Sequence, residues 1–282
     1  MKYILNNALV DSSQAHIHIS DVGLLRAYGI FDFFRIQGRT PLYLDAHIER
    51  FIQSANQFRL KPTITVEEMR ALILNMLATN KMEDSGVRMV LTGGSSANGF
   101  DPGIPNLIIT QEPLNFAADA VYQSGVGLMT LEHMRELPEI KTTNYLTAIY
   151  HWPKLAAYKA SDILYKYQGE VYEVTRSNFF IIDSQDIIYT ANKGILRGIN
   201  RAEIIRMCGE SFEVQEQSIS LNMVMQAKEA FITGTTKKIM PIVRIDNRAV
   251  GNNDKPGKIT QMLMQQYEER VKKLVAETGH VW

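Results

Sequence analysis

Lys141 stands between a strand-like run and a helix-like run, in a segment whose residue types suit amine chemistry. The hydroxyl groups of Thr142 and Thr143, directly after it, can accept hydrogen bonds from the free backbone N–H groups where a helix begins. The surrounding residues, 137–146, are largely apolar, and such surroundings favour the neutral amine that attacks a carbonyl group. The pattern predicts a nucleophilic lysine. A solvated lysine in front of a helix is the alternative.

Glu173 is the second candidate, because it interrupts an apolar run near the end of a predicted strand. A carboxylate buried there is costly unless it has a cationic partner. A protonated pyridine nitrogen is such a partner, and the pair keeps a pyridine ring electron-poor, so that the ring accepts the electrons of a substrate carbanion. An amine and a carboxylate in these roles are what an enzyme dependent on pyridoxal phosphate requires. The alternative places Glu173 on an exposed strand face.

Four further positions are candidates for binding the cofactor phosphate: Arg50, Ile199, Asn200 and Thr235. The run 198–200 precedes a predicted helix, and free N–H groups at a helix N-terminus bind phosphate well. Thr235 stands between Gly234 and Thr236, where hydroxyl groups and a glycine allow close approach. Arg50 comes three residues after His47, so both project from one side of the predicted helix 45–58.

The order and spacing of these segments resemble the fold-type IV (class IV) pyridoxal phosphate enzymes. That group includes D-amino acid aminotransferase, branched-chain amino acid aminotransferase and aminodeoxychorismate lyase. The resemblance extends from near the N-terminus to about residue 245. It rests on the segments 44–50, 140–145, 173–180, 195–201 and 230–235, with Pro241 beyond them. These motifs identify the family rather than the substrate.

The resemblance implies a role for each matching residue. Lys141 resembles the lysine that forms the Schiff base with pyridoxal 5'-phosphate and acts as general acid and base, and Glu173 resembles the partner of the pyridine nitrogen. Leu196 matches the side chain packed on the cofactor ring. The phosphate-binding positions of the family are matched by Arg50, Ile199, Asn200 and Thr235. Family members usually have Thr at the position of Asn200, so backbone donation is retained there without the hydroxyl contact.

The substrate side departs from the family pattern. The loop 93–100 lacks the arginine and histidine with which many D-amino acid aminotransferases bind the substrate α-carboxylate. We hypothesise that Arg26 and Arg176 replace them, with Arg88 as a third candidate, because a guanidinium group binds a carboxylate bidentately. Each could instead form a structural ion pair, and Arg176 needs a turn at 174–175 to reach the side of Glu173. The other predicted substrate contacts are Phe31, Phe33 and Thr236.

These roles imply an aminotransferase that moves an amino group from an amino acid to a 2-oxo acid such as 2-oxoglutarate or pyruvate. D-alanine and D-glutamate are the preferred donors, because 141–144 has the shorter spacing of that branch and 47–50 fit it. Branched-chain L-amino acids are the alternative. They are favoured because the loop 93–100 lacks the carboxylate-binding arginine and histidine, and because Phe31 and Phe33 could line an apolar pocket. Aminodeoxychorismate lyase chemistry is a third alternative. A non-catalytic pyridoxal phosphate-binding protein and a cofactor-free interaction protein lie outside this class.

Composition excludes several other classes of function. The chain has 282 residues, of which 45% are hydrophobic, and its 30 basic and 30 acidic residues give no net charge. We therefore expect neither nucleic-acid nor membrane binding. The histidines and the single cysteine, Cys208, lack metal-ligand spacing, so no metal is expected. With no signal-peptide pattern and no membrane span, the sequence predicts a cytoplasmic protein.

Predicted strands and helices must position these residues. They alternate along the chain without a regular βαβ rhythm, which favours an α/β (α+β) fold in two domains. We predict domains at 1–113 and 120–282, joined by a linker at 114–119. The resemblance adds a smaller N-terminal domain, a larger C-terminal domain with a β-barrel-like core, and a homodimer with shared active sites. Helices are predicted at 45–58, 66–80, 145–159, 201–208, 221–228 and 258–277. Asp45 is the predicted N-cap of the first of these helices, and Pro153 should kink the helix 145–159 or shift its start. Strands are predicted at 3–5, 8–10, 31–37, 40–44, 87–92, 107–111, 126–131, 162–167, 171–174, 179–182, 187–189, 230–233 and 239–243. The first two strands should form a hairpin around Asn6-Asn7, and the next two a hairpin around Gly38-Arg39.

Overall fold

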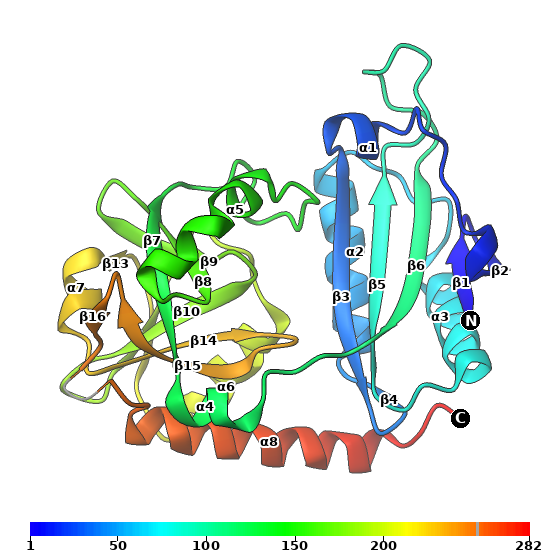
Figure 1. Cartoon of the computed structure of the whole chain (residues 1–282). Coiled ribbons are helices and arrows are strands. Elements are labelled where there is room, and N and C mark those ends of the chain that lie inside the picture. Colours follow the sequence, from blue (N-terminus) through cyan, green and yellow to red (C-terminus); the bar gives the residue numbers. More distant parts are fainter. Residues whose placement is uncertain (252–253) are drawn as a thin grey trace. The chain divides into compact units, whose positions relative to one another are not determined.

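The structure, a computed structural model, describes residues 1–251 and 254–282, and its contacts divide the chain into two compact units. The first unit comprises Met1–Leu114, Ile140–Asn144 and Lys273–Trp282, and the second comprises Asn115–Glu139 and Tyr145–Lys272. Figure 1 shows their helices and strands. The predicted domain boundaries at 113 and 120 stay a prediction. The first unit also includes Ile140–Asn144 and Lys273–Trp282. The prediction assigned both of these segments to the second domain.

The first unit is built on a six-stranded antiparallel sheet in the order β2-β1-β6-β5-β3-β4. Its strands are β1 (Lys2–Leu5), β2 (Ala8–Asp11), β3 (Gly29–Gln37), β4 (Thr40–Pro41), β5 (Ser85–Thr92) and β6 (Asn106–Pro113). Both predicted hairpins of this region are confirmed. Their two-residue turns are Asn6-Asn7 and Gly38-Arg39, and all four residues have positive φ angles, as a tight turn between twisted strands requires.

Two helices, α2 (Leu44–Gln57) and α3 (Val66–Asn80), pack against this sheet and against each other. Helix α3 begins with a capping box, in which Thr65 accepts from the Glu68 N–H and Glu68 accepts from the Thr65 N–H. Alternation along β3 gives the sheet one face toward the helices and one face turned away from them. The helix-facing core contains Ile30, Phe34, Ile48, Phe51, Ile73 and Leu77.

The start of α2 differs from the prediction. Asp45 was the expected N-cap, but the N-cap is Tyr43, in the left-handed conformation and without a side-chain cap. The Asp45 carboxylate instead accepts a hydrogen bond from Arg70 Nε at 2.8 Å, which draws it away from the backbone. Since α2 begins at Leu44, the predicted strand 40–44 is shortened to β4. Asp45 still lies in the first turn, where an acidic group favours the helix dipole.

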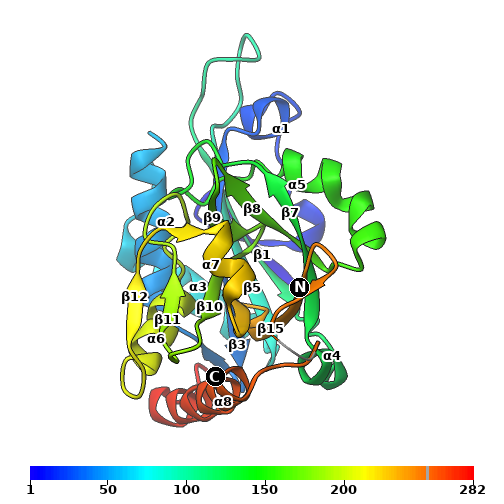
Figure 2. The ribbon, with the colours of Figure 1, turned by 90° about the vertical axis from the view of Figure 1, so that its left-hand side faces the viewer.

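The second unit contains a closed six-stranded barrel. Its strands are β7 (Val126–Glu132), β8 (Asp162–Tyr167), β9 (Glu170–Val174), β10 (Ser177–Ile182), β14 (Glu229–Gly234) and β15 (Lys238–Ile245). They pair in the order β10-β14-β15-β7-β8-β9, and β9 pairs back to β10, which closes the ring. Figures 1 and 2 show these strands curving around a common interior. That interior is filled by apolar side chains including Leu128, Leu164, Phe179 and Ile232.

The barrel carries short additional strands and most of the remaining helices. The strands are β11 (Ile188–Thr190), β12 (Val214–Glu216), β13 (Ile219–Ser220) and β16 (Arg248–Ala249), and the helices are α4 (Asp119–Ser124), α5 (Leu146–His151), α6 (Ile199–Cys208), α7 (Leu221–Gln226) and α8 (Lys258–Thr278). The predicted helix 145–159 is interrupted near Pro153, as expected, and continues as the 3-10 helix Trp152–Tyr158. The elements that the sequence did not indicate, α1 (Val22–Arg26) and β12, β13, β16 and α4, are all short.

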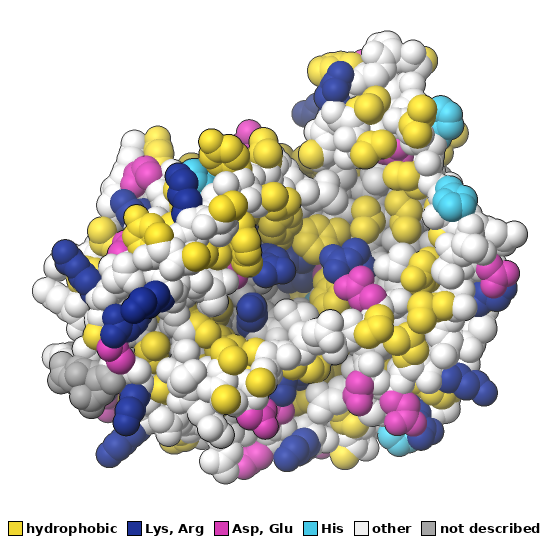
Figure 3. All heavy atoms as spheres, viewed as in Figure 1, with side chains coloured by type: hydrophobic (Ala, Val, Ile, Leu, Met, Phe, Trp, Pro, Cys, Tyr) yellow, Lys and Arg dark blue, Asp and Glu magenta, His cyan; other side chains and the backbone are white. Residues whose placement is uncertain are grey.

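These elements confirm the predicted α/β (α+β) class with a barrel in its C-terminal part. Within the described ranges, no helix is long and apolar enough to cross a membrane. Lysine and arginine side chains are interspersed with acidic ones over the face shown in Figure 3, in agreement with the balanced charge of the chain.

Candidate active site

Lys141 is held against the first half of strand β3 by the backbone on both sides of it. The Phe31 N–H donates to the Lys141 carbonyl at 2.8 Å, and the Thr143 N–H donates to the Gly29 carbonyl at 2.9 Å. Thr142 forms an isolated bridge with Ile30 between these two bonds. The segment 141–143 thus acts as a short extra strand, and it places Lys141 Nζ 4.6 Å from the centroid of the Phe31 ring.

Arg50 and His47 project from the same side of α2, as predicted, and both bind Asp32 of β3. Arg50 donates from Nε to Asp32 Oδ2 and from Nη2 to Oδ1, each at 2.8 Å. His47 Nδ1 lies 2.7 Å from Asp32 Oδ1. Sequence reasoning missed Asp32, although an acidic residue in the apolar run Phe31-Asp32-Phe33-Phe34, facing a helix with Arg and His, is a signal for such a group.

The electrostatics of this cluster follow from its burial. Burial by itself raises the pKa of Asp32, but the opposed charge of Arg50, followed by His47, outweighs it and holds that pKa well below the usual 3.8. For His47, burial lowers the pKa below its usual 6.5, Asp32 opposes this, and Arg50 and Lys141 add to the lowering. Asp32 is therefore an anion and His47 a neutral imidazole near neutral pH, and the Arg50 guanidinium has a fixed orientation.

Glu173 lies in β9 of the second unit and is 5% exposed. Its Oε1 accepts from Arg135 Nε at 2.9 Å. Its Oε2 accepts from the Leu196 backbone N–H at 3.0 Å and from Asn178 Nδ2 at 3.4 Å. The exposed-face interpretation is therefore wrong, and Glu173 and Leu196, two residues predicted separately to bind the cofactor, are in contact. Sequence reasoning missed Arg135 and Asn178, since the fold alone brings their distant segments together.

The predicted phosphate positions Ile199 and Asn200 form the first turn of α6, with the extended Gly198 as N-cap. The first internal bond of this helix runs from the Ala202 N–H to the Gly198 carbonyl, which leaves the earlier N–H groups for a ligand. Asn178 supports this helix start, because its Nδ2 donates to the Leu196 carbonyl at 2.7 Å. A Cβ atom on Gly198 would overlap Asn178 Oδ1, so the close approach requires glycine.

Thr235 and Thr236 lie in the turn between β14 and β15, beside a second turn that carries Arg176. Val174 pairs with Ser177, so Thr175 and Arg176 form the two-residue turn between β9 and β10, one residue later than the predicted turn at 174–175. A Cβ on Gly234 would lie 3.1 Å from the Arg176 carbonyl oxygen, so the two turns are adjacent. The Arg176 guanidinium lies over the Trp152 ring, with Cζ 5.6 Å from its centroid.

The two remaining arginine candidates belong to the first unit. Arg26 ends α1, is exposed, and donates from Nη1 to the Leu25 carbonyl at 2.8 Å. Arg88 lies in β5, pairs with Glu112 through Nη2 and Oε1 at 2.6 Å, and has its guanidinium over the rings of Phe31 and Phe33. Arg88 therefore lies against the same phenyl ring as Lys141, whereas the guanidinium of Arg26 bonds to the backbone of its own helix end.

The donor set fits pyridoxal phosphate. A primary amine (Lys141) and an oriented guanidinium (Arg50) are present in the first unit, and a buried carboxylate (Glu173) and a helix N-terminus (Ile199 and Asn200) are present in the second. These groups match an aldehyde, a dianionic phosphate and a pyridine nitrogen in chemistry. Among the described residues, no three His, Cys, Asp or Glu side chains are grouped so that they could hold a metal ion.

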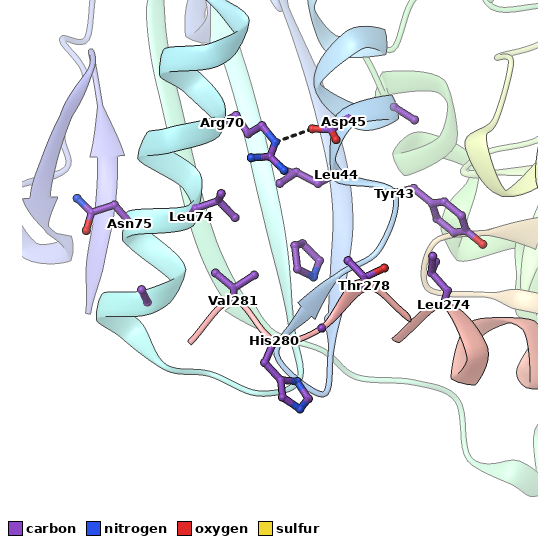
Figure 4. Close-up of a pocket in the computed structure, with 14 residues that line it drawn as sticks. Tyr43, Leu44, Asp45, Arg70, Leu74, Asn75, Leu274, Thr278, His280 and Val281 are labelled. Atoms are coloured by element: carbon purple, nitrogen blue, oxygen red, sulfur yellow. Dashed lines mark hydrogen bonds and ion pairs between the residues drawn. The ribbon is translucent and has the colours of Figure 1, made fainter. Parts of the chain in front are cut away.

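A cavity of about 650 Å³ lies elsewhere in the first unit, between the start of α2, helix α3 and the C-terminal segment (Figure 4). Leu44, Leu74 and Val281 contribute apolar side chains to it, and Arg70 beside it is paired with Asp45. The predicted site residues do not contribute to its lining as far as the chain is described. We therefore assign the chemistry to the Lys141 and Glu173 clusters.

Comparison with known proteins agrees with this donor set. The family model described as "Amino-transferase class IV" matches residues 29–245. The chain belongs to the class IV aminotransferases. It is a transaminase that depends on pyridoxal phosphate.

Individual relatives fall into two groups. The chain is 31% identical to the "Putative branched-chain-amino-acid aminotransferase" of Methanocaldococcus jannaschii, over 95% of this chain and 96% of that protein. It is 26% identical to the D-alanine aminotransferase of Bacillus licheniformis, over 99% and 100%. Among solved structures, a T.th. branched-chain amino acid aminotransferase with pyridoxamine 5'-phosphate has a TM-score of 0.89 at 22% identity, covering 100% of this chain and 98% of that one. This last likeness confirms the fold.

Proposed function

We propose that this aminotransferase takes the amino group from a D-amino acid of the D-alanine or D-glutamate type and transfers it to a 2-oxo acid such as 2-oxoglutarate or pyruvate. The observation that carries the proposal is the short connection from Lys141 to α5. Thr142 and Thr143, the first two residues of this connection, are fixed on strand β3 by a bridge and a backbone hydrogen bond. Likeness to D-alanine aminotransferases over nearly the whole chain supports it.

The residues that hold the cofactor are, in this proposal, Lys141, Arg50, Glu173, Leu196, Ile199, Asn200 and Thr235. Pyridoxal phosphate, when bound, supplies an electron-poor ring that accepts the electrons left when the substrate Cα loses its proton. Glu173 keeps the ring nitrogen protonated, and its orientation is fixed by the Leu196 N–H and Arg135. The phosphate is bound by the N–H groups at the start of α6, the Thr235 hydroxyl group and the Arg50 guanidinium.

Lys141 moves the proton. Its amine would take the proton from the substrate Cα as a general base and then deliver it as a general acid. The Phe31 ring, 4.6 Å from Nζ, excludes water from one side of the amine. The main-chain bonds at Lys141 and Thr143 fix the start of this long side chain, so that its free end swings over a limited arc.

The substrate α-carboxylate is bound, in this proposal, by Arg26 and Arg176, with Thr236 beside Arg176. The support is chemical, since a guanidinium group binds a carboxylate bidentately. Both side chains are exposed, and the Arg26 guanidinium donates to a backbone carbonyl, so neither arginine is committed to a carboxylate of this chain in the described structure. The substrate Cα substituent then lies against Phe31 and Phe33.

A branched-chain L-amino acid is the second candidate donor. It is favoured by the 31% identity to the M. jannaschii protein and by the two phenyl rings, which offer an apolar surface near Lys141. Aminodeoxychorismate lyase chemistry is the third candidate from the sequence, and a non-catalytic cofactor-binding protein is a further one. The likeness to a solved lyase-type structure at 24% identity shows the shared fold alone.

The test is the half-reaction with matched enantiomers. Holoprotein is mixed separately with D-alanine, L-alanine, D-leucine, L-leucine and aminodeoxychorismate, and the absorbance of the bound cofactor is followed. We expect loss of the aldehyde-form band with D-alanine and a rate at least about tenfold lower with L-alanine, which corresponds to about 1.4 kcal/mol of discrimination. A faster change with L-leucine would replace the first proposal by the second. A spectrum that no amino acid changes would support the non-catalytic alternative.

We also propose that the protein is a homodimer with shared active sites and that it is cytoplasmic. The dimer is supported by large exposed apolar side chains grouped on α5 (Leu146, Ile149 and Tyr150), each at least 70% exposed. Light scattering after gel filtration is expected to give twice the 32.0 kDa chain mass. Replacing Ile149 by Lys is expected to give monomers. The cytoplasmic location is supported by the single, buried, unpaired cysteine, Cys208.

A further inference from the structure

Asp162, the first residue of β8, is completely buried, and its carboxyl group bonds to the turn that carries Arg176. Its Oδ1 accepts hydrogen bonds from the Thr175 hydroxyl group at 2.5 Å and from the Ile163 N–H at 2.8 Å. Its Oδ2 is also buried and has no hydrogen-bond partner among the residues that the structure describes. A buried carboxyl oxygen without a partner is costly, and an apolar side chain at this position would avoid that cost. Stability alone therefore does not account for Asp162.

Thr175 is the anchor of the turn between β9 and β10. Its side chain is buried, its N–H donates to the Ile163 carbonyl at 3.2 Å, and its hydroxyl group donates to Asp162. The next hydroxyl group along the chain, that of Ser177, is buried without a hydrogen-bond partner in the described ranges, so it does not hold the turn. Because each residue has only two soft backbone dihedral angles, fixing Thr175 limits the directions in which Arg176 leaves the turn.

Arg176 points the other way, since it is exposed while Thr175 beside it is buried. Its guanidinium group lies over the Trp152 ring, with Cζ 5.6 Å from the centroid. A cation–π contact at an exposed site is weak, and it leaves the edge of the guanidinium group open to an acceptor. Trp152 supports the far end of this side chain, and the turn determines where the side chain begins.

Asp162 and Arg176 also interact through their charges. Burial raises the pKa of Asp162 above its usual 3.8. The two hydrogen bonds to Oδ1 oppose this effect, and so do the positive charges of Arg176 and Lys237. Lys237 belongs to the neighbouring turn, between β14 and β15. One buried carboxyl group thus lies close to the cations of both turns.

We propose that Asp162 is a positioning residue for the substrate α-carboxylate. Through its hydrogen bond to the Thr175 hydroxyl group, it fixes the β9–β10 turn and thereby the direction in which Arg176 presents its guanidinium group. The proposal deepens the proposed function and rests on the assignment of the α-carboxylate to Arg176. Because the amino donor and the 2-oxo acid both carry this carboxylate, loosening the turn weakens the binding of both to the same degree.

The experiment removes the hydrogen bond from the Thr175 side, where the volume of the side chain can be conserved. In Thr175→Val, the KM values for the active amino donor and for the 2-oxo acid should both rise about tenfold, while kcat and the affinity for pyridoxal phosphate change less than about twofold. Thr175→Ser keeps the hydroxyl group and should restore the wild-type KM values. Asp162→Asn keeps an oxygen acceptor and should also resemble wild type, whereas Asp162→Leu should resemble Thr175→Val. The two Thr175 variants decide the question even where Asp162→Leu does not fold.

A double variant shows whether the bond acts through Arg176. In an Arg176→Ala background, Thr175→Val should cause no further rise of either KM, because the group that the turn positions is already absent. A further rise there, or unchanged KM values in Thr175→Val alone, overturns the proposal. If Arg176→Ala by itself leaves both KM values unchanged, the α-carboxylate role in the proposed function has failed, and the positioning role fails with it. The single Arg176 variant therefore separates the two failures.

The matched control is Thr260→Val. Thr260 is also completely buried, and its hydroxyl group donates to a buried carboxylate, Glu229 Oε2, at 2.7 Å. Glu229 begins β14, whereas the turn that contains Thr235 follows the other end of that strand. Thr260→Val should lower stability and leave both KM values unchanged. An equal rise of KM in both valine variants would assign the effect to a general loss of stability and would overturn the proposal.

Discussion

Asp32 and Arg50 form a two-point ion pair across the boundary between β3 and α2, with Nε–Oδ2 and Nη2–Oδ1 distances of 2.8 Å each. Asp32 is completely buried, whereas the Arg50 side chain is 14% exposed. The buried carboxylate thus neutralises and orients a cation whose outer edge stays accessible. In the proposed function Arg50 binds the phosphate dianion of the cofactor, so its orientation matters as much as its charge.

The first prediction concerns Asp32→Asn. The variant keeps the shape of the side chain but leaves Arg50 without its anion, and breaking a buried pair in this way costs about 3–5 kcal/mol of unfolding free energy. We expect weaker binding of pyridoxal phosphate as well, because Arg50 loses the carboxylate that orients its guanidinium group. Urea denaturation measures the first effect and absorbance titration of the apoprotein measures the second.

The control for that variant is Asp45→Asn, which removes from α2 the exposed ion-pair partner of Arg70 on α3. An exposed pair contributes about 0–1 kcal/mol, so this variant should be nearly as stable as wild type. Similar losses in both variants would show that burial does not distinguish the two pairs. Retained cofactor affinity in Asp32→Asn would show that Arg50 needs no orientation.

The second prediction is a pH dependence of stability that arises from His47. Burial lowers the pKa of His47 below 6.5, so as the pH falls below 6.5 the unfolded chain binds a proton there before the folded chain does. Stability therefore decreases as the pH falls, by at most about 1.4 kcal/mol per pH unit for one proton. His47→Gln should remove this slope between about pH 5 and 7 whatever it does to overall stability. An unchanged slope would assign the effect to other groups.

Asp32 contributes to the pH dependence of stability at lower pH. The folded state favours the charged form of Asp32, whereas it disfavours the charged form of His47. Burial raises its pKa in the folded protein, but Arg50 and His47 outweigh this effect and depress that pKa below the usual 3.8. Its stabilising contribution is fully present above that usual value and is lost as the pH falls through the folded-state pKa. The two groups therefore act in separable pH ranges, His47 below 6.5 and Asp32 below 3.8.

Much of the fold could be predicted from the sequence, because helix caps, apolar spacing and turn residues act within a few residues along the chain. Helix α3 has the predicted bounds, Val66–Asn80, since a capping box begins it and apolar spacing continues through it. The hairpin turns follow from their Asn and Gly residues. Asp45 was misassigned because a cap and a salt bridge compete for the same carboxylate, and the sequence does not indicate which of them forms.

The residues of the candidate site also differ in whether a local sequence pattern reveals them. Lys141 and Glu173 stand out because their neighbours are apolar, which is a local signal. Arg135 and Asn178 do not stand out, because each acquires its role only when the barrel brings it to Glu173. Asp32 is intermediate: it stands in an apolar strand, but its partners lie on a helix that follows. Residues that position a catalytic group through long-range contacts are the ones that a single sequence conceals.

The third prediction concerns Gly198→Ala. A methyl group there overlaps Asn178 Oδ1 and lies 3.2 Å from the Arg201 Cβ, so Asn178 has to move away from the Leu196 carbonyl. We expect the variant to fold, with a loss of about 1–3 kcal/mol from overpacking, and to bind pyridoxal phosphate about tenfold more weakly. Gly209→Ala, at the other end of α6, is the matched control. Its Cβ meets only ordinary contacts, at 3.4 Å and beyond, so the substitution should be neutral or slightly stabilising.

The fourth prediction concerns Lys141. In Lys141→Ala, loss of the amine that moves the Cα proton should lower kcat by about 10²-fold to 10⁴-fold, the range expected for a lost general acid–base group. Lys272→Ala, an exposed lysine of α8, should have wild-type kcat. Borohydride reduction of the wild-type holoprotein, followed by peptide mapping, should place the cofactor on the peptide that contains residue 141. A label on any other lysine, or full activity in Lys141→Ala, would remove the foundation of the proposed function, because that function takes the amine beside Phe31 as the reacting group.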